Sequence, residues 1–311
     1  MKAVRIHAYG GHDVLVYEDA PRPTPGPGEV LIQVHASSVN LFDCAVHAGY
    51  LHPFFNYTFP LIVGTDVSGV VDELGEGVTN VSTGDAVYTR AGVFRDGGNA
   101  EYALALASDV ATKPQSLDHI HAAAIPHVGL AAWYALIDLA NLSEGQTVLI
   151  HGAAGGVGHI AVQLAQLRGA KVIGTASVNL DFLHELGVDE AIDYSTTAFE
   201  DVVKDVDVVL DLIGGDTQER SWKVLKPGGI LITTQTYPPS EEMAAAHGVR
   251  RGHVDRTPQM RMALTEFAKM VDAGQIKPHV STILPLADVQ KAHELIASMH
   301  TRGKIVLQVV S

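Results

Sequence analysis

Cysteine is almost absent from this chain of 311 residues, which contains a single one, Cys44. One cysteine excludes an intramolecular disulfide and a cysteine-rich zinc lobe. No Lys, Arg or His flanks Cys44 in the sequence, so we expect a buried, unreactive thiol. The sixteen histidines are scattered without the spacing of metal ligands, and no metal site is expected.

The chain also lacks long apolar runs and an excess of positive charge. No apolar stretch reaches the roughly 18 residues that a membrane-spanning helix needs, and the start, MKAVRIHAYG, has no apolar signal region. The formal net charge of −14 argues against nucleic-acid or anionic-membrane partners, because their phosphates repel such a field. These absences predict a soluble protein of a reducing compartment, the cytoplasm.

The most informative stretch that is present covers residues 147–168, TVLIHGAAGGVGHIAVQLAQLR. Its apolar start is typical of a buried parallel strand, and the apolar spacing at its end predicts a helix. Glycines between the two let the chain turn sharply and let backbone N–H groups approach a diphosphate; they are Gly152, Gly155, Gly156 and Gly158. The spacing departs from strict G-x-G-x-x-G, so a glycine-rich turn without a ligand stays as the alternative.

Short apolar runs follow this turn and alternate with helical patterns. Strands are expected at 171–175, 190–194, 206–213 and 229–234, and helices near 180–186, 216–225 and 259–273. This alternation predicts an α/β fold with a doubly wound parallel sheet, whose ligand crevice lies at the carboxyl ends of the strands.

The first third of the chain shows a different pattern, in which apolar residues recur at every second position. It predicts a β-rich domain with strands at 2–7, 29–39, 59–74, 84–90 and 99–107. Near the other end of the chain, we expect residues 277–283 either to supply a sixth strand to the parallel sheet or to form the boundary. The predicted domains are 1–118 with 284–311, and 119–283.

Seven stretches in order resemble a known family. They are SVN with Asp43 (38–43), FPLIVGTDVSG (59–69), GGNAEY (97–102), AAAIPHVGLAAW (122–133), AAGGVG (153–158), KPGG (226–229) and TRGKIVL (301–307). The chain resembles the medium-chain dehydrogenase/reductase superfamily, in its zinc-independent, quinone oxidoreductase-like branch. The resemblance implies a GroES-like catalytic domain made of both chain ends, a Rossmann domain between them and a nicotinamide cofactor.

Zinc-dependent members of this family hold catalytic zinc with a Cys, a His and a second Cys. The resemblance places Asn40, Thr65 and His127 at these three positions. Asn and Thr are poor zinc ligands, and one His cannot complete a tetrahedral site, so alcohol oxidation is disfavoured. The chemistry that remains is hydride transfer to an acceptor that is already polarised, a quinone or an α,β-unsaturated carbonyl.

Three residues are candidates for the catalytic site. Asn40 can donate an amide N–H to the substrate carbonyl or to the cofactor ribose, although an Asn that ends a strand also binds its own backbone. Tyr50, after Gly49, offers a phenol as donor or proton source, with pocket lining as the alternative. His127 lines the vacated metal position or has a structural role.

The cofactor is expected to be NADPH. An NAD site places an acidic residue at the end of the second strand, but that region reads Gly174, Thr175, Ala176 and Ser177, and Ser177 accepts a 2′-phosphate. By resemblance Tyr194 contacts the same phosphate. The source of positive charge for this phosphate stays open. The expected cofactor-binding residues are Gly152, Ala153, Gly155, Gly156, Val157, Ser177, Tyr194, Ile213 and Thr233.

The function expected from the sequence is therefore an NADPH-dependent reductase of quinones or enones. The alternative is an NADPH-binding protein without turnover, acting as a redox sensor or a structural protein, because fold does not decide function. We also expect a homodimer that pairs through an edge strand near 249–256, although the polar residues there are unusual for such an interface. They are Arg250, Arg251, His253, Asp255 and Arg256.

Overall fold

The computed structural model describes residues 1–93, 95–255 and 259–310. It divides into two compact units, each described by itself below. The first unit comprises residues 1–127, 259–274 and 278–311, and the second comprises 128–258 and 275–277. Residues 119–127, 259–274 and 278–283, which the sequence analysis placed in the Rossmann domain, thus belong to the first unit.

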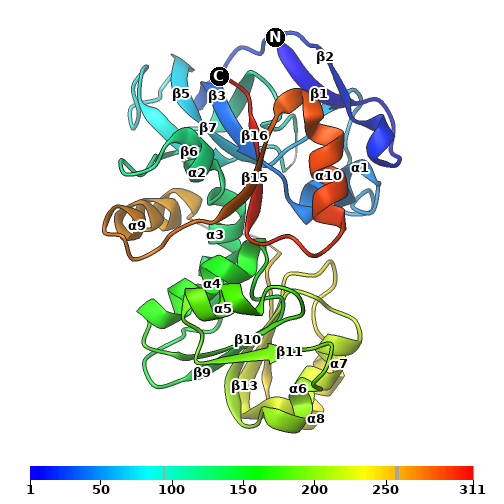
Figure 1. Cartoon of the computed structure of the whole chain (residues 1–311). Helices are drawn as coiled ribbons and strands as arrows, with labels where there is room; N and C mark the ends of the chain where they lie inside the picture. The colour runs from blue at the N-terminus through cyan, green and yellow to red at the C-terminus, as the bar shows by residue number, and fades with distance from the viewer. Residues whose placement is uncertain (94, 256–258, 311) are drawn as a thin grey trace. The chain divides into compact units, whose positions relative to one another are not determined.

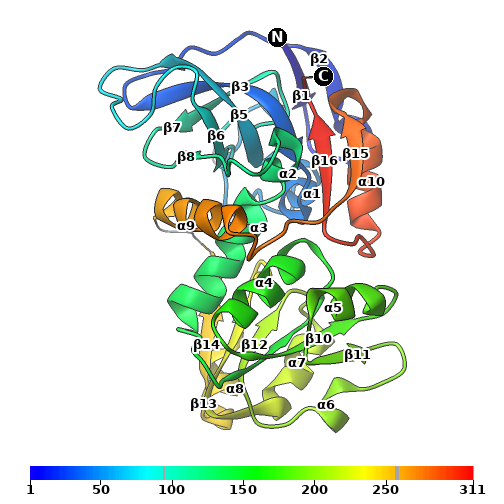
Figure 2. The ribbon, with the colours of Figure 1, turned by 60° about the vertical axis from the view of Figure 1, so that its left-hand side comes forward.

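The second unit is built around one parallel six-stranded sheet (Figures 1 and 2). Its strands are β9 (Thr147–Ile150), β10 (Lys171–Ala176), β11 (Glu190–Asp193), β12 (Val206–Asp211), β13 (Leu225–Thr233) and β14 (Arg250–His253). Their order is β11-β10-β9-β12-β13-β14, and every neighbouring pair is parallel. This is the doubly wound order in which the chain reverses direction beside the first strand, and it confirms the predicted fold class.

Helices cover both faces of this sheet. They are α4 (Gly156–Leu167), α5 (Leu180–Leu186), α6 (Phe199–Val202), α7 (Asp216–Ser221) with the 3-10 turn η3 (Trp222–Val224), and α8 (Glu241–His247), preceded by the π-helix η2 (Tyr134–Leu139). Alternate strand residues such as Leu149 and Leu231 pack with Phe199 and Trp222 in one apolar core. Helix α4 ends before Gly169, whose φ of 72° is a left-handed conformation that suits glycine.

The first unit contains two sheets. Strands β1 (Lys2–Ile6), β2 (Val16–Asp19) and β4 (Leu61–Ile62) form a small antiparallel sheet in the order β2-β1-β4. The larger sheet has the order β15-β16-β3-β5-β6-β8, with β7 paired to β3. Its strands are β3 (Glu29–Ser38), β5 (Asp66–Leu74), β6 (Ala86–Arg90), β7 (Tyr102–Leu106), β8 (Ala111–Thr112), β15 (Val280–Pro285) and β16 (Lys304–Gln308).

The C-terminal segment joins this sheet, which corrects the sixth-strand role considered for 277–283. Strand β15 pairs with β16, and β16 pairs antiparallel with β3. The sixth place in the parallel sheet is filled by β14 instead, because it follows β13 directly and extends the same edge. Helix α9 (Met260–Asp272) also belongs to the first unit, where the Tyr88 hydroxyl donates to the carbonyl of Leu264 at 2.5 Å.

The remaining helices of the first unit frame its core. They are η1 (His12–Val14), α1 (Leu41–His47), α2 (His119–Ala123), η4 (Leu286–Asp288) and α10 (Val289–Ala297). Helix α3 (Pro126–Trp133) begins in the first unit, and its residues from 128 onward belong to the second. Apolar residues from both chain ends, Val4 and Leu307 among them, share one core cluster. Among the described helices, none has the length and apolar character required to cross a membrane.

Candidate cofactor turn and polar cluster

The turn between β9 and α4 is shaped by its glycines. Gly152 has a φ of 66°, and the N–H of Gly155 donates to its carbonyl at 3.0 Å. A Cβ on Gly158 would lie 2.3 Å from the same carbonyl oxygen, so only glycine fits where α4 packs against the turn. The N–H of Ala153 donates to the Thr175 carbonyl at 3.0 Å, which ties the turn to β10.

The start of α4 carries no side-chain cap. Gly155 occupies the N-cap position and, in the part of the chain that the structure describes, makes no side-chain cap to the first turn, where Gly156 and Val157 lie. Uncapped N–H groups at the positive end of a 12-residue helix are donors for an anion. The turn therefore fits a diphosphate, which its backbone N–H groups would hold.

His151, which the sequence analysis did not single out, precedes this turn and stabilises it through hydrogen bonds of its ring. The Ser221 hydroxyl donates to the Thr217 carbonyl at 2.7 Å, so it accepts a hydrogen bond from His151 Nε2 at 3.0 Å. His151 Nδ1 lies 3.2 Å from the Thr175 hydroxyl and accepts from it. Burial lowers the pKa of His151 to about 4, so the ring is neutral and both of its nitrogens are paired.

The two residues expected at the adenosine end lie together. Ala176 and Asp193 are in register at the ends of β10 and β11, and each is followed by one of the candidates. The Ser177 hydroxyl donates to the Tyr194 hydroxyl at 2.9 Å. Two neutral hydroxyl groups thus meet at the carboxyl ends of adjacent parallel strands.

A buried carboxylate, Asp211, organises the next loop of the same sheet edge. Its Oδ1 accepts from the N–H groups of Ile213 and Gly214 at 3.0 and 2.9 Å. Its main-chain carbonyl accepts from the Thr233 hydroxyl at 3.2 Å, which links the ends of β12 and β13. The candidates Ile213 and Thr233 are therefore held by one residue, and only Ile213 has an exposed side chain.

The first unit holds a second set of polar side chains, which we call the polar cluster: Ser38, Asn40, Asp43, Thr65, Asp66, His127 and Lys304. At its centre Asp66 Oδ2 accepts from the Ser38 hydroxyl at 2.5 Å and from the Asn40 amide at 2.8 Å. Lys304 Nζ lies 3.4 Å from the same oxygen and donates to Asn40 Oδ1 at 2.5 Å. Asp66 and Lys304 are both almost fully buried, so this is a buried ion pair.

Asn40 and Asp43 begin helix α1 within this cluster. Asp43 Oδ2 accepts from the Asn40 N–H at 2.9 Å. Burial and the neighbouring Asp66 raise the pKa of Asp43 to about 7, while a hydrogen bond from the Thr65 hydroxyl acts in the opposite direction. Burial lowers the pKa of Lys304, which the Asp66 carboxylate counteracts.

His127 joins the cluster through its backbone and its ring. Its N–H donates to Asp66 Oδ1 at 2.7 Å, and its Nδ1 lies 3.3 Å from Thr65 Oγ1. The same Thr65 oxygen accepts from the Asn40 amide at 3.1 Å. Removal from water and the positive charge of Arg90 lower the pKa of His127 to about 3, so its imidazole is neutral.

The donor set at the family's zinc position does not fit that ion. The Asn40 amide is bound to Asp66 and Thr65, and its Oδ1 accepts from the Lys304 ammonium. Thr65 supplies a neutral hydroxyl, and only His127 is an ordinary zinc ligand. An ammonium group beside the position would also repel a dication.

Tyr50 and Cys44 lie outside the cluster. Tyr50 follows Gly49, whose φ is 79°, and its side chain is 75% exposed. Cys44 Sγ lies 3.5 Å from His293 Nδ1, a neighbour that its sequence flanks do not reveal. Burial and Asp43 raise the pKa of Cys44 to about 12, which agrees with the expected unreactive thiol.

Comparison with known proteins adds to this geometry. Residues 26–115 match an alcohol dehydrogenase GroES-like domain, and 186–307 match a zinc-binding dehydrogenase domain. A 2-haloacrylate reductase from a Burkholderia species is 33% identical over 98% of this chain and 98% of its own. A mitochondrial NAD(P)H oxidoreductase from Danio rerio is 31% identical over 100% and 92%. The cytoplasmic location expected from the sequence stays a prediction.

Two solved structures are also similar over the full length. A quinone oxidoreductase from Coxiella burnetii has a TM-score of 0.92 and 34% identity, covering 100% of this chain and 99% of its own. A quinone oxidoreductase from Escherichia coli, solved with NADPH, has a TM-score of 0.90 and 26% identity, covering 99% and 100%.

Proposed function

This chain belongs to the medium-chain dehydrogenase/reductase family, and we propose that it is an NADPH-dependent reductase of quinones or α,β-unsaturated carbonyls that works without zinc. The observation that carries the proposal is the polar cluster, in which a neutral His127 stands beside Asn40 and Thr65 at the family's zinc-ligand positions. A hydrogen-bond donor here polarises a carbonyl without a Lewis acid.

His127 is the donor in this proposal. Thr65 Oγ1 already accepts a hydrogen bond from the Asn40 amide. The proton of the Thr65 hydroxyl is therefore donated either to His127 Nδ1 or to Asp43. Protonation of Asp43, whose pKa is about 7, favours the first arrangement, and the imidazole proton then lies on Nε2. Nε2–H donates to the substrate carbonyl oxygen, where negative charge develops in the transition state.

Asn40 acts as a positioning residue in this scheme. Its amide hydrogens are bound to Asp66 and Thr65 rather than free for a substrate. Lys304 fixes the other end of the same amide through Oδ1. Asn40 therefore orients Thr65, and through it the imidazole of His127.

The reaction balances with one hydride and one proton. NADPH, held by the glycine turn, would supply a hydride to the β-carbon of an enone or to a quinone. The displaced π electrons move to the carbonyl oxygen, where His127 stabilises the charge by a hydrogen bond. A proton from water completes the saturated ketone or the hydroquinone, because an imidazole with a pKa near 3 is held neutral.

The preference for NADPH rests on the Ser177–Tyr194 pair. The end of β10, where an NAD site has the acidic side chain that binds the ribose hydroxyls, has none. The Tyr194 hydroxyl, which accepts from Ser177 at 2.9 Å, can donate to a 2′-phosphate, and neither hydroxyl group repels it. The glycine turn and the Asp211 loop hold the rest of the dinucleotide.

The test is anaerobic NADPH oxidation with a simple quinone, an enone and a 2-haloacrylate, after treatment with a chelator. We expect the chelator-treated protein to turn over, and we expect added zinc to leave its rate unchanged. Thr65→Val and His127→Gln should lower kcat by about ten- to a thousandfold while NADPH affinity is unchanged. NADPH binding without turnover of any acceptor would instead favour the redox sensor or structural protein.

Self-association is part of the proposal as well. Strand β14 is one edge of the parallel sheet among the described residues, and an unpaired edge is a ready surface for an isologous partner. Arg256, part of the polar stretch considered for this contact, lies outside the described residues. Light scattering at micromolar concentration should report a dimer, and a monomer would contradict this assignment.

A further inference from the structure

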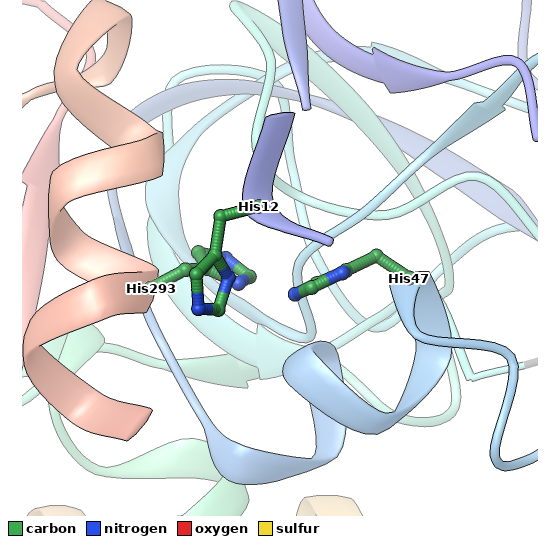
Figure 3. Close-up of side chains that lie close together, drawn as sticks. All are labelled: His12, His47 and His293. Atoms are coloured by element: carbon green, nitrogen blue, oxygen red, sulfur yellow. The ribbon is translucent and has the colours of Figure 1, made fainter. Parts of the chain in front are cut away.

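Three histidines converge in the first unit, away from the polar cluster. His12 comes from η1, His47 is the last residue of α1 and His293 lies in α10 (Figure 3). One ring nitrogen from each lies within 4.8 Å of the others. Within the described part of the chain, this is the one group of three His, Cys, Asp or Glu side chains with such a spacing.

One nitrogen of each of these rings is buried and has no hydrogen-bond partner among the described residues. These nitrogens are His12 Nδ1, His47 Nε2 and His293 Nε2. The side chains of His47 and His293 are 2% and 0% exposed. Buried polar atoms are nearly always paired, so three unpaired nitrogens aimed into one space call for a ligand.

The opposite side of the His47 ring is held in the way that metal ligation requires. His47 Nδ1 lies 3.1 Å from the Gly10 carbonyl, which can only accept, so the ring proton is on Nδ1 and the lone pair is on Nε2. His293 Nδ1 lies 3.5 Å from Cys44 Sγ, and when Nδ1 donates to this sulfur, Nε2 carries the lone pair. A ligating histidine commonly donates its other N–H to such a partner.

The three rings also lie close together, and neutral imidazole is the form that binds a metal. The ring centroids lie 5.1 Å apart for His47 and His293 and 5.2 Å apart for His12 and His47.

We propose that His12, His47 and His293 bind one divalent late first-row metal ion, with zinc as the expected occupant. Three neutral imidazoles suit zinc and its neighbours, whereas calcium and magnesium require oxygen ligands. Three ligands leave a fourth tetrahedral position for water. Zinc–nitrogen bonds of about 2.0–2.1 Å require the rings to close in, and His12, which is only partly buried, lies on a short 3-10 turn that can follow.

This site differs from the family's zinc position in place and in ligands. Asn40, at the family position, caps the start of α1, whereas His47 ends that helix. An ion bound by the three histidines links the beginning of the chain, α1 and α10. Its role is therefore to hold both chain ends of the first unit together, whether or not the proposed reductase activity is correct.

The experiment uses the full chain, stripped with a chelator and dialysed. Co²⁺ is titrated and followed by its visible absorption, and Zn²⁺ is followed by metal analysis and by the thermal unfolding temperature. We expect one tightly bound equivalent, a four-coordinate Co²⁺ spectrum and a higher unfolding temperature. No tight equivalent would overturn the proposal and leave three histidines packed against one another.

Variants locate the ion. His12→Gln should weaken Co²⁺ and Zn²⁺ binding by about a hundredfold or more, and its partial exposure favours a folded variant. His293→Gln provides a second ligand change if His12 is replaced by water. Two matched controls should retain the equivalent: half-exposed His121→Gln, and His127→Gln at the family position. Loss of the ion with His127→Gln, or its retention in both ligand variants, would overturn the assignment.

Discussion

The two units of this protein build their polar sites in opposite ways. The second unit offers main-chain N–H groups at the start of α4, and the histidine beneath them is neutral. The first unit uses side chains, with Asp66 and Lys304 as a buried ion pair. Loss of one partner from such a pair leaves an unpaired charge in the interior, whereas a main-chain site has no such partner to lose. Stability and site geometry are thus coupled in the first unit and largely separate in the second.

The largest expected effect tests this coupling. Lys304→Met should lower the free energy of unfolding of the first unit by about 3–5 kcal/mol, because Asp66 stays buried without its partner. Lys226→Met in the second unit is the matched control, since Lys226 pairs with Asp207 but is 44% exposed. That change should have an effect of about 1 kcal/mol or less. Denaturant unfolding measures the free energy of unfolding of both variants. Equal losses of that free energy would contradict the difference between the two units.

At the glycine turn we expect the opposite result, a loss of cofactor affinity with little loss of stability. Gly156→Asp should weaken NADPH binding by about a hundredfold, close to 3 kcal/mol, because a carboxylate faces the diphosphate in a partly desolvated turn. The unfolding temperature should stay near that of the parent protein. Gly156→Ala adds a methyl group without charge and separates bulk from repulsion. Fluorescence titration measures the affinity, and unchanged NADPH binding in the Asp variant would exclude the turn as the diphosphate site.

His151 makes the second unit sensitive to acid. Its pKa is about 4 in the folded protein and about 6.5 in an unfolded chain, so the unfolded state binds more protons between these values. Stability therefore falls as the pH drops from 6.5 towards 4, by about 2 kcal/mol at pH 5 from this residue. His151→Gln retains a donor for Ser221 and an acceptor for Thr175 and should flatten that slope. A slope equal to that of the parent protein would contradict the assignment.

The smallest effect sharpens the cofactor assignment. Ser177→Asp should weaken NADPH binding by about tenfold, about 1.4 kcal/mol, because its carboxylate meets the 2′-phosphate. NADH lacks this phosphate, so its affinity serves as the control within the same variant. Parallel losses for both cofactors would instead place Ser177 away from the phosphate.

The sequence predicted the second unit well because its signals are local. Strand β9, the glycine turn and α4 lie within 147–168, and α5 covers the expected 180–186. Periodicity predicts strands but not their partners, which is why β15 was considered for the wrong sheet. The side chains that support a site were also missed, although Asp211 at the end of an apolar strand was a visible signal.

The polar cluster shows the limit of local patterns more clearly. Asn40 and His127 stood out only through the family resemblance, and Lys304, which fixes the Asn40 amide, comes from the last strand. A lysine at the start of the apolar run KIVLQ could have been noticed, but nothing in the run identifies its partner. The three histidines are hidden for the same reason, because their spacing exists only after folding.

The pairing of β16 with β3 also orders the events of synthesis. A ribosome releases residues 128–258 before it reaches β16, so the parallel sheet can form while translation continues. Asp66 lacks its ion-pair partner Lys304, and β3 lacks its neighbour β16, until nearly the whole chain has been synthesised. The unit whose synthesis begins first is the one completed last, and its unpaired carboxylate and open strand edge are what a chaperone would meet in the interval.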